Sequence, residues 1–414
     1  MTPSKRYNRR TFLCGAAAIG LGTAAAGCRL PLPFELLGKA TAVEKRSGLE
    51  YRALGKTGLK VALLGMGGYH FIERSAAETQ TIIARYLDLG GNYVETAYAY
   101  GNGDSEKKVG AALLGKRDHV VLATKAATRD KAGAAKLLDT SLANLQTDHV
   151  DIWIMHAVQS PQELESILAP EGALRTAEEA KQAGKVRFIG ISAHGWADVL
   201  IDALQRYPFD VVMHNFNYLD RFNFPSSELE LLPLALAKGV GVVGMKAVGD
   251  GLLYRSPEAA LRYTFGLPIA TMAAGMNTLA YLETDMTAAK AYQPMTSAEQ
   301  ETLFKDAPEL GNYVCRQCGK CLPNERNVPI PTIFQLEGML DRQMIDFNEH
   351  DAAETNLRNQ LAYWFALGNV AKERYRALKI NKDDFASCAA VEPNCPYGLP
   401  IVRKLEYVNA KLTV

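Results

Sequence analysis

Short apolar runs alternate with amphipathic segments from residue 61 onward, a pattern typical of a parallel β-sheet whose strands are joined by helices. The apolar runs predict strands at Val61–Gly65, Asn92–Glu95, Val120–Lys125, Val150–His156, Phe188–Ser192, Val211–Asn215, Gly241–Met245 and Ile269–Ala273. The amphipathic segments predict helices, for example Ala76–Leu89, Ser105–Leu114, Ala132–Leu145, Thr176–Ala183 and Leu229–Lys238. Strand–helix units repeated over about 210 residues fit a closed (β/α)8 TIM barrel.

A doubly wound open sheet is the alternative arrangement of such units. That fold normally carries the pattern G-x-G-x-x-G directly after its first strand. Here the first predicted strand ends in Gly65-Met66-Gly67-Gly68, which does not have this spacing. The barrel is therefore the better interpretation.

The pattern changes after about residue 300. Helix-like segments at Thr332–Met344 and Ala352–Lys372 replace the alternation, and five of the seven cysteines follow residue 314. We expect an α/β protein in which a barrel over residues 29–300 precedes a mostly helical domain over residues 301–414.

Four polar residues lie at or just after the ends of three consecutive predicted strands. Glu95 ends the second strand with Tyr100 in the following loop, Lys125 ends the third strand, and His156 ends the fourth. Catalytic groups of TIM barrels gather at the carboxyl ends of the strands. Singly, each of these residues has a structural explanation, but as a set they predict an active site.

The chemistry of these groups suits proton transfer to a carbonyl. A tyrosine hydroxyl has a pKa near 10, so a nearby cation is needed to lower it. Lys125 is the nearest predicted cation, Glu95 is placed to hold it, and His156 is placed to hydrogen-bond a carbonyl oxygen.

Over residues 50–290 the sequence resembles the aldo-keto reductases. The matching motifs are Tyr51–Val61, Asn92–Gly101, Ser105-Glu106 with Gly110, Thr124-Lys125 and Ile154–His156. The resemblance implies that Tyr100 is the general acid, that Lys125 lowers its pKa and that His156 orients the carbonyl. Glu95 stands where the family has aspartate.

The resemblance also implies a nicotinamide dinucleotide, NAD or NADP. Its expected contacts are Ser192, Asn215, Gly249, Gly251, Gly275 and Asn277. Backbone amides near the three glycines are expected to hold the pyrophosphate. The family's usual partners are replaced at Ala193, Met213 and Met245. No Lys or Arg lies between Arg262 and Lys290 to bind a ribose 2′-phosphate, so the choice between NAD and NADP stays open.

The C-terminal cysteines have the spacing of iron–sulfur ligands. In two-cluster ferredoxins the fourth cysteine of C-x2-C-x2-C-x3-C-P ligates the other cluster. By that rule Cys315, Cys318, Cys321 and Cys395 form one complete 4Fe–4S set. The second set would need Glu325, Phe385, Cys388 and Val391, so only Cys388 remains of it. This resembles aldo-keto reductases with a C-terminal ferredoxin-like domain, with one site erased.

Three alternatives compete with an electron-transferring cluster. A structural zinc site uses four thiolates but favours paired C-x2-C units. Disulfides suit an exported protein, yet three cysteines three residues apart do not pair easily with one another. A cluster that only stabilises the fold of the tail is the third alternative.

The N-terminus resembles a twin-arginine export signal. Arg9-Arg10-Thr11-Phe12-Leu13 is followed by an uncharged run from Cys14 to Ala26. That run of about 13 residues is too short to span about 30 Å of hydrocarbon. We expect residues 1–28 to be the signal, followed either by lipidation of Cys28 or by simple cleavage after Ala26, and a location in or facing the periplasm.

The charge balance excludes a nucleic-acid partner. The chain carries 46 basic and 45 acidic residues, and without the four basic residues of the first ten, 42 basic residues remain against 45 acidic ones. No concentrated basic face is available. The expected partners are a small-molecule carbonyl or alcohol, a redox protein and the Tat export machinery. The expected function is that of an exported oxidoreductase; the alternative is a non-catalytic barrel that serves as scaffold for an electron-transfer or assembly module.

Overall fold

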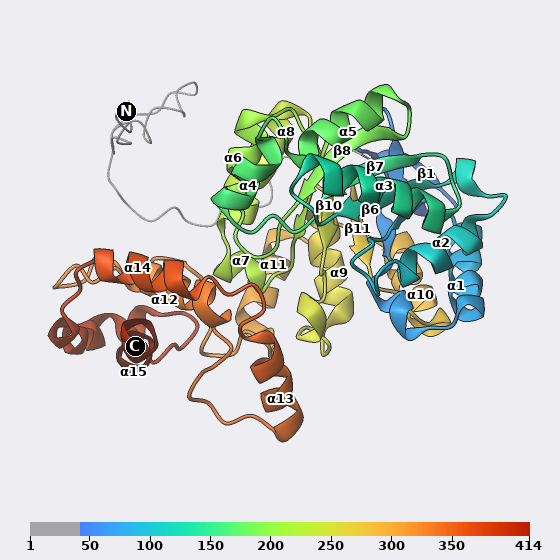
Figure 1. Ribbon diagram of the computed structural model, residues 1–414. Helices are drawn as coiled ribbons and strands as arrows, with labels where there is room; N and C mark the ends of the chain where they lie inside the picture. Colours follow the sequence, from blue (N-terminus) through green and yellow to red (C-terminus); the bar gives the residue numbers. More distant parts are fainter. Residues whose placement is uncertain (1–41) are drawn as a thin grey trace, which may run out of the picture.

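The computed structural model describes residues 42–414, which form a barrel and a helical domain packed against one of its sides (Figure 1). The predicted export signal, with Cys28, lies outside the described residues. Within residues 42–414, no helix has both the length and the apolar character needed to cross a bilayer.

Eight parallel strands close into a barrel, which confirms the predicted (β/α)8 architecture. The order around the barrel follows the chain, and the first strand pairs with the last. The strands are β4 (Leu64–Gly67), β5 (Tyr93–Glu95), β6 (Val121–Ala126), β7 (Val150–Met155), β8 (Val186–Ser192), β9 (Val211–Asn215), β10 (Gly241–Met245) and β11 (Thr271–Ala274).

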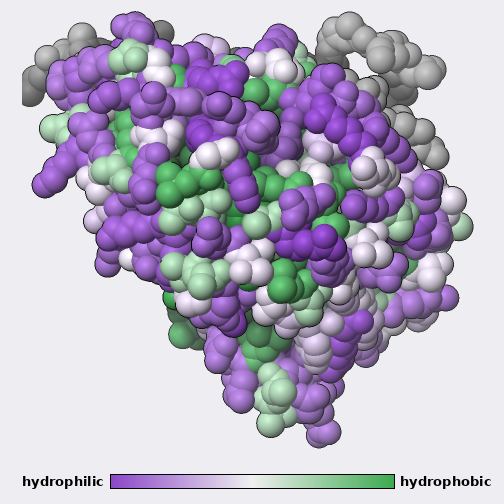
Figure 2. Space-filling view, turned by 90° about the vertical axis from the view of Figure 1, so that its right-hand side faces the viewer, coloured by the Kyte–Doolittle hydropathy of each residue, from purple (hydrophilic) through white to green (hydrophobic). Residues whose placement is uncertain are grey.

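The outer helices follow the strands and bury one face each. They are α1 (Ala76–Asp88), α2 (Asp104–Leu113), α3 (Lys131–Leu145), α4 (Pro161–Leu168), α5 (Ala173–Gln182), α6 (Asp198–Arg206), α7 (Asp220–Asn223), α8 (Leu232–Lys238), α9 (Pro257–Gly266) and α10 (Leu279–Lys290). Side-chain caps start several of them; in α1, Ser75 and Glu78 form a reciprocal capping box. The face that carries α1, α2 and α10 is largely hydrophilic, with small hydrophobic patches (Figure 2).

An antiparallel sheet precedes the barrel and closes its floor. It consists of β1 (Ala42–Arg46), β2 (Leu49–Ala53) and β3 (Lys60–Ala62). Leu54 and Val61 are fully buried and pack into the apolar interior of the barrel. Arg52 of β2 is also buried and donates to the carbonyl oxygens of Leu267 (3.2 Å) and Ile269 (2.9 Å). The predicted strand at 61–65 is therefore wrong in one respect: the chain leaves this sheet and enters the barrel at Leu63.

The C-terminal region is helical. Its helices are α11 (Ser297–Asp306), α12 (Ile330–Asp341), α13 (Ala352–Leu361), α14 (Gly368–Ala377) and α15 (Ile401–Thr413), with 3-10 turns over Lys382–Asn394. The single helix predicted for 352–372 is wrong. It breaks after Leu361, and Phe365 in the gap has a left-handed backbone (φ 70°). The ferredoxin-like character of this domain stays a prediction.

The helical domain docks on the loops that follow β8, β9 and β10. Arg374 lies over the ring of Trp196, 4.0 Å from its centroid. The hydroxyl of Tyr218 donates to Glu309 at 3.1 Å. Since these loops all lie at the carboxyl ends of the strands, the domain contacts the face of the barrel where TIM-barrel enzymes have their active sites.

Candidate active site

The four predicted catalytic residues meet at the carboxyl end of the barrel. Glu95 is the last residue of β5, Lys125 is next to last in β6, and His156 directly follows β7. The Lys125 ammonium nitrogen Nζ lies 2.8 Å from the Tyr100 hydroxyl oxygen and forms an ion pair with Glu95. It also donates to the carbonyl oxygen of Thr96 at 3.0 Å. All three N–H groups of the lysine ammonium are therefore directed to fixed partners.

Two further rings surround the Tyr100 side chain. The ring of His156 meets it edge-on, with centroids 5.9 Å apart, and the ring of Tyr69 does so at 5.2 Å from the loop after β4. Tyr69 is 48% exposed, so the site opens to solvent beside it. Tyr100 itself is half-buried.

Burial sets the protonation states of the site. It raises the pKa of Tyr100 above its ordinary value, which keeps the hydroxyl protonated at neutral pH. It lowers the pKa of Lys125, although the contact with Glu95 favours the charged amine. Burial, with smaller contributions from Lys125 and Arg129, lowers the pKa of His156 to about 3, so its imidazole is neutral. That Lys125 lowers the pKa of Tyr100 stays a prediction, because burial acts in the opposite direction.

This arrangement provides a proton donor beside a neutral hydrogen-bond donor. A carbonyl oxygen placed between Tyr100 and His156 would accept both hydrogens. The contact from Lys125 stabilises the phenolate that remains after the proton has left.

Two predicted nucleotide contacts are already engaged within the protein. The Ser192 hydroxyl accepts from the amide of Ala157 at 3.0 Å. The Asn215 side chain accepts from the amide of Gly195 (2.7 Å) and donates to Asp220 (2.7 Å). Both residues are buried at the ends of β8 and β9, so their geometry is fixed by neighbouring loops.

The predicted glycine loops lie at the ends of β10 and β11. Gly249 and Gly251 have left-handed backbones, and their amides donate to the carbonyls of Lys246 and Val248 within the same turn. A Cβ on Gly275 would lie 2.7 Å from the His70 ring, so this loop packs closely against the loop after β4.

Asn277 lines a cavity of about 390 Å3. Its side chain also donates to Glu73 at 3.2 Å. Arg74 and Glu78 line the same cavity at the start of α1. Arg74 therefore places a cation at this cavity, although the sequence has no Lys or Arg between Arg262 and Lys290.

Sequence reasoning also missed a group around His194 and Lys246. His194 stacks on Phe365 of the helical domain, with centroids 4.5 Å apart, and its buried Nδ1 has no hydrogen-bond partner among the described residues. Lys246 pairs with Asp250 and lies 4.6 Å from the Phe365 ring centroid. Lys246 follows the last residue of β10, so the strand-end pattern that identified Lys125 was available to find it.

The cysteines predicted to hold a cluster line one cavity. Cys315, Cys318, Cys321 and Cys395 share the wall of a cavity of about 20 Å3 with Arg316 and with mostly apolar residues. Burial raises the pKa of Cys315 and of Cys321 to about 12. Cys388 is fully buried and is not part of this wall; that it is the remnant of a second ligand set stays a prediction.

One alternative for these cysteines, the disulfide, is disfavoured. All five cysteines in residues 42–414 are free, so no disulfide forms in that part of the chain. Among the described residues, no three His, Cys, Asp or Glu side chains are grouped so that they could hold a metal ion, so neither the zinc site nor the cluster is shown, and both stay predictions.

Comparison with known proteins places this site in a family. The Aldo/keto reductase family model matches residues 63–277, slightly more than half of the chain. The chain belongs to the aldo/keto reductase family. It is accordingly an oxidoreductase of the type that acts on small-molecule carbonyl or alcohol substrates.

Individual members resemble the barrel. The L-galactose dehydrogenase of Arabidopsis thaliana is 34% identical over 219 residues, which cover 50% of this chain and 67% of that protein. The L-glyceraldehyde 3-phosphate reductase of Escherichia coli K12 is 27% identical over 232 residues, 51% of this chain and 64% of that protein. The structure of aldo-keto reductase AKR11C1 from Bacillus halodurans superposes with a TM-score of 0.53 at 28% identity, over 63% of this chain and 97% of that one. The family match ends before the cysteine-containing domain begins.

Proposed function

We propose that this aldo-keto reductase interconverts a carbonyl and an alcohol with Tyr100 as the proton donor and acceptor. The observation that carries the proposal is the buried contact of Lys125 with both Tyr100 and Glu95, beside the neutral imidazole of His156. His156 holds the substrate oxygen, Tyr100 transfers the proton to it, and Lys125 stabilises the resulting phenolate. The substitution of Glu95 for aspartate preserves the ion pair.

A nicotinamide dinucleotide, NAD or NADP, would supply the hydride when bound. The residues that would hold it are Ser192, Asn215 and the turns at Gly249–Gly251 and Gly275–Asn277. An orphaned buried nitrogen on His194, close to this region of the barrel, supports a ligand there. Arg74 beside Asn277 offers a cation for a 2′-phosphate, which supports NADP over NAD.

We further propose one 4Fe–4S cluster in the helical domain. The donor set is four thiols on the wall of one cavity, and the spacing of the cysteines supports an iron–sulfur cluster. When bound, the cluster would pass single electrons to or from a redox partner protein. The export signal, the Tat machinery and a periplasmic location complete the proposal, because a folded-protein export route carries an assembled cluster.

The first experiment looks for the bound cofactors. The full chain is purified without oxygen and denatured, and the supernatant is chromatographed for nicotinamide nucleotide while iron and sulfide are assayed. We expect close to one nucleotide and four irons per chain. If no nucleotide is released and none binds when added, the hydride mechanism is refuted; the scaffold alternative would then be preferred.

The second experiment tests the role of Tyr100 with 4-nitrobenzaldehyde as a general carbonyl probe and added NADPH as the hydride donor. Tyr100→Phe removes the transferable proton, and we expect kcat to fall by about 10²- to 10⁴-fold. Tyr281→Phe, on the exposed surface of α10, is the matched control and should keep full activity. Equal rates for the two variants would refute the role of Tyr100.

A further inference from the structure

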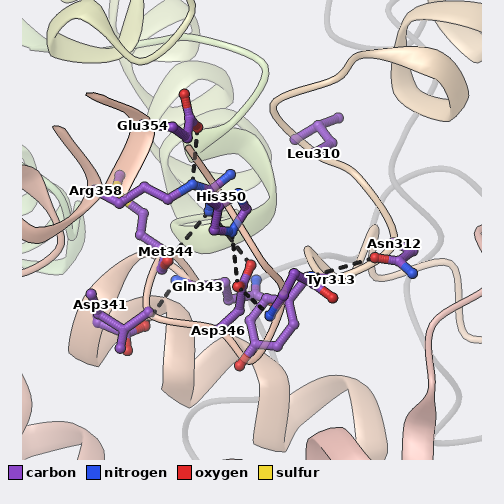
Figure 3. Close-up of polar contacts among 12 residues, drawn as sticks. Leu310, Asn312, Tyr313, Asp341, Gln343, Met344, Asp346, His350, Glu354 and Arg358 are labelled. Atoms are coloured by element: carbon purple, nitrogen blue, oxygen red, sulfur yellow. Dashed lines mark hydrogen bonds and ion pairs between the residues drawn. The ribbon is translucent and has the colours of Figure 1, made fainter. Parts of the chain in front are cut away.

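Two adjacent residues at the end of α12 have a strained backbone. Arg342 (φ 55°) and Gln343 (φ 56°) are both left-handed, and both side chains are almost fully buried. Non-glycine residues in this region are uncommon and persist only where the surroundings hold them, often at functional sites. Figure 3 shows Gln343 beside Asp341, whose carboxylate accepts a hydrogen bond from the backbone N–H of Gln343 at 3.0 Å. This Arg342–Gln343 turn contacts the barrel through Arg342 and the cysteine cavity through Gln343.

Arg342 connects the helical domain to the barrel. Its Nη2 lies 2.7 Å from Asp220 Oδ1, and its Nη1 lies 3.4 Å from Asp250 Oδ2. The other oxygen of Asp220 accepts from the amide groups of Asn215 (2.7 Å) and Asn217 (2.8 Å). Arg342 and Asp220 are at most 3% exposed, so the ion pair is shielded from solvent.

These barrel partners adjoin residues predicted to bind the nucleotide. Asp220 accepts from Asn215, a predicted nucleotide contact, and Asp250 lies between Gly249 and Gly251 in the predicted pyrophosphate turn. Arg342 therefore contacts two parts of the proposed nucleotide site from outside the barrel, through the carboxylates of Asp220 and Asp250.

Gln343 connects the same turn to the cysteine cavity. Its Oε1 accepts from the backbone amide of Cys315 (3.0 Å) and from Lys404 Nζ (2.9 Å). Its Nε2 donates to Asn223 at 2.9 Å. Asn223 ends α7, the helix that begins at Asp220, so Arg342 and Gln343 hold the two ends of one short barrel helix.

We propose that the Arg342–Gln343 turn is a positioning element that couples the nucleotide site of the barrel to the cysteine cavity. A change in the cavity shifts Cys315 and Gln343, and the adjacent Arg342 passes that shift to Asn215 and the 249–251 turn. Coupling of this kind is reciprocal, and its usual size is about 5- to 150-fold in affinity. The inference rests on the proposed function, because it requires both a cluster and a nucleotide.

The test uses ADP-ribose as a probe, since it is redox-inert and presents the pyrophosphate. Its Kd is measured by calorimetry on the anaerobic full-length protein, with the cluster oxidised and again after dithionite reduction. The midpoint potential is then titrated by EPR with and without ADP-ribose. We expect the two Kd values to differ at least about fivefold. Reciprocity requires a matching shift in potential, about 59 mV per tenfold for one electron.

Variants of the turn separate its two arms. Arg342→Met should weaken ADP-ribose binding and abolish the redox dependence of Kd, and Arg342→Lys should restore part of it. Gln343→Leu does not change the net charge. It should keep the Kd for ADP-ribose in the oxidised state within about twofold, but abolish the shift in midpoint potential that ADP-ribose causes. Arg403→Met is the matched control: Arg403, on α15 of the same domain, lies over the ring of Phe347, 4.0 Å from its centroid, and its removal should leave the coupling intact.

Two kinds of failure are distinguishable. If iron and ADP-ribose both bind but the two Kd values agree, or if Gln343→Leu retains the full shift in potential, the coupling is refuted and the proposed function stands. If the protein binds no iron or no ADP-ribose, the proposed function fails and this inference fails with it.

Discussion

Replacing Lys125 with methionine is the sharpest test of how the catalytic site is held together. The substitution preserves the length and apolar stem of the side chain but removes the nitrogen that contacts Tyr100, Glu95 and the Thr96 carbonyl. Lys125 and Glu95 are at most 4% exposed at their side chains. The variant therefore leaves a buried carboxylate without its cation.

The magnitude follows from that burial. Breaking a buried ion pair by removing one partner costs about 3–5 kcal/mol. This is a large fraction of the about 5–15 kcal/mol by which folded proteins are usually stable. The loss of the hydrogen bond to the Tyr100 oxygen should lower kcat by a further factor of about 10²–10³, because the phenolate loses its stabilising donor.

The assay is a double-mutant cycle with Glu95→Gln, followed by urea unfolding and by reduction of 4-nitrobenzaldehyde. In the double variant no buried charge remains, so we expect it to recover at least about half of the stability lost in Lys125→Met, while kcat stays low. If Lys125→Met alone unfolds at the wild-type urea concentration, or if its kcat is unchanged, the ion pair does not organise the site and the reasoning is wrong.

Three further outcomes are expected. His156 has a pKa of about 3 in the folded protein and of about 6.5 when unfolded, so its imidazole stays neutral near pH 7. The pH profile of kcat/KM should therefore show no inflection near 6.5, and an inflection there that His156→Gln abolishes would contradict this. The unfolded protein alone binds a proton at His156 between pH 6.5 and 3, so the free energy of unfolding should fall as the pH falls through that range. Gly91→Ala should destabilise the fold by about 1–3 kcal/mol in thermal unfolding, because the new Cβ would lie 2.1 Å from the ring of Tyr86; an unchanged melting temperature would show that the ring can move aside. Cys395→Ala should lose the iron, whereas Cys388→Ala should keep it, as measured by iron analysis after anaerobic purification; the reverse result would overturn the ligand assignment.

The barrel could be predicted because its strands are buried on both faces. The predicted strands Val211–Asn215 and Gly241–Met245 coincide with β9 and β10, in which every residue is buried. The catalytic residues follow from the same logic, since the end of a strand determines where Glu95 and Lys125 lie. Local pattern is sufficient wherever the determining contacts are close in the chain.

Contacts between distant segments could not be predicted in this way. The gap between α13 and α14 has helix-forming residues, yet the chain breaks there so that Phe365 stacks on His194 of the barrel. Arg342 gave no signal either, because its partner Asp220 lies 122 residues earlier in the chain. Only tertiary packing brings these side chains together, and it overrides the local preference for a helix.

The sheet of β1, β2 and β3 determines from which end reactants reach the barrel. Its buried residues Leu54 and Val61 fill the end opposite Tyr100. With that end closed, reactants and products approach Tyr100 from the carboxyl ends of the strands, where Tyr69 is exposed. We therefore expect both binding and release to take place at the end of the barrel opposite the sheet of β1, β2 and β3.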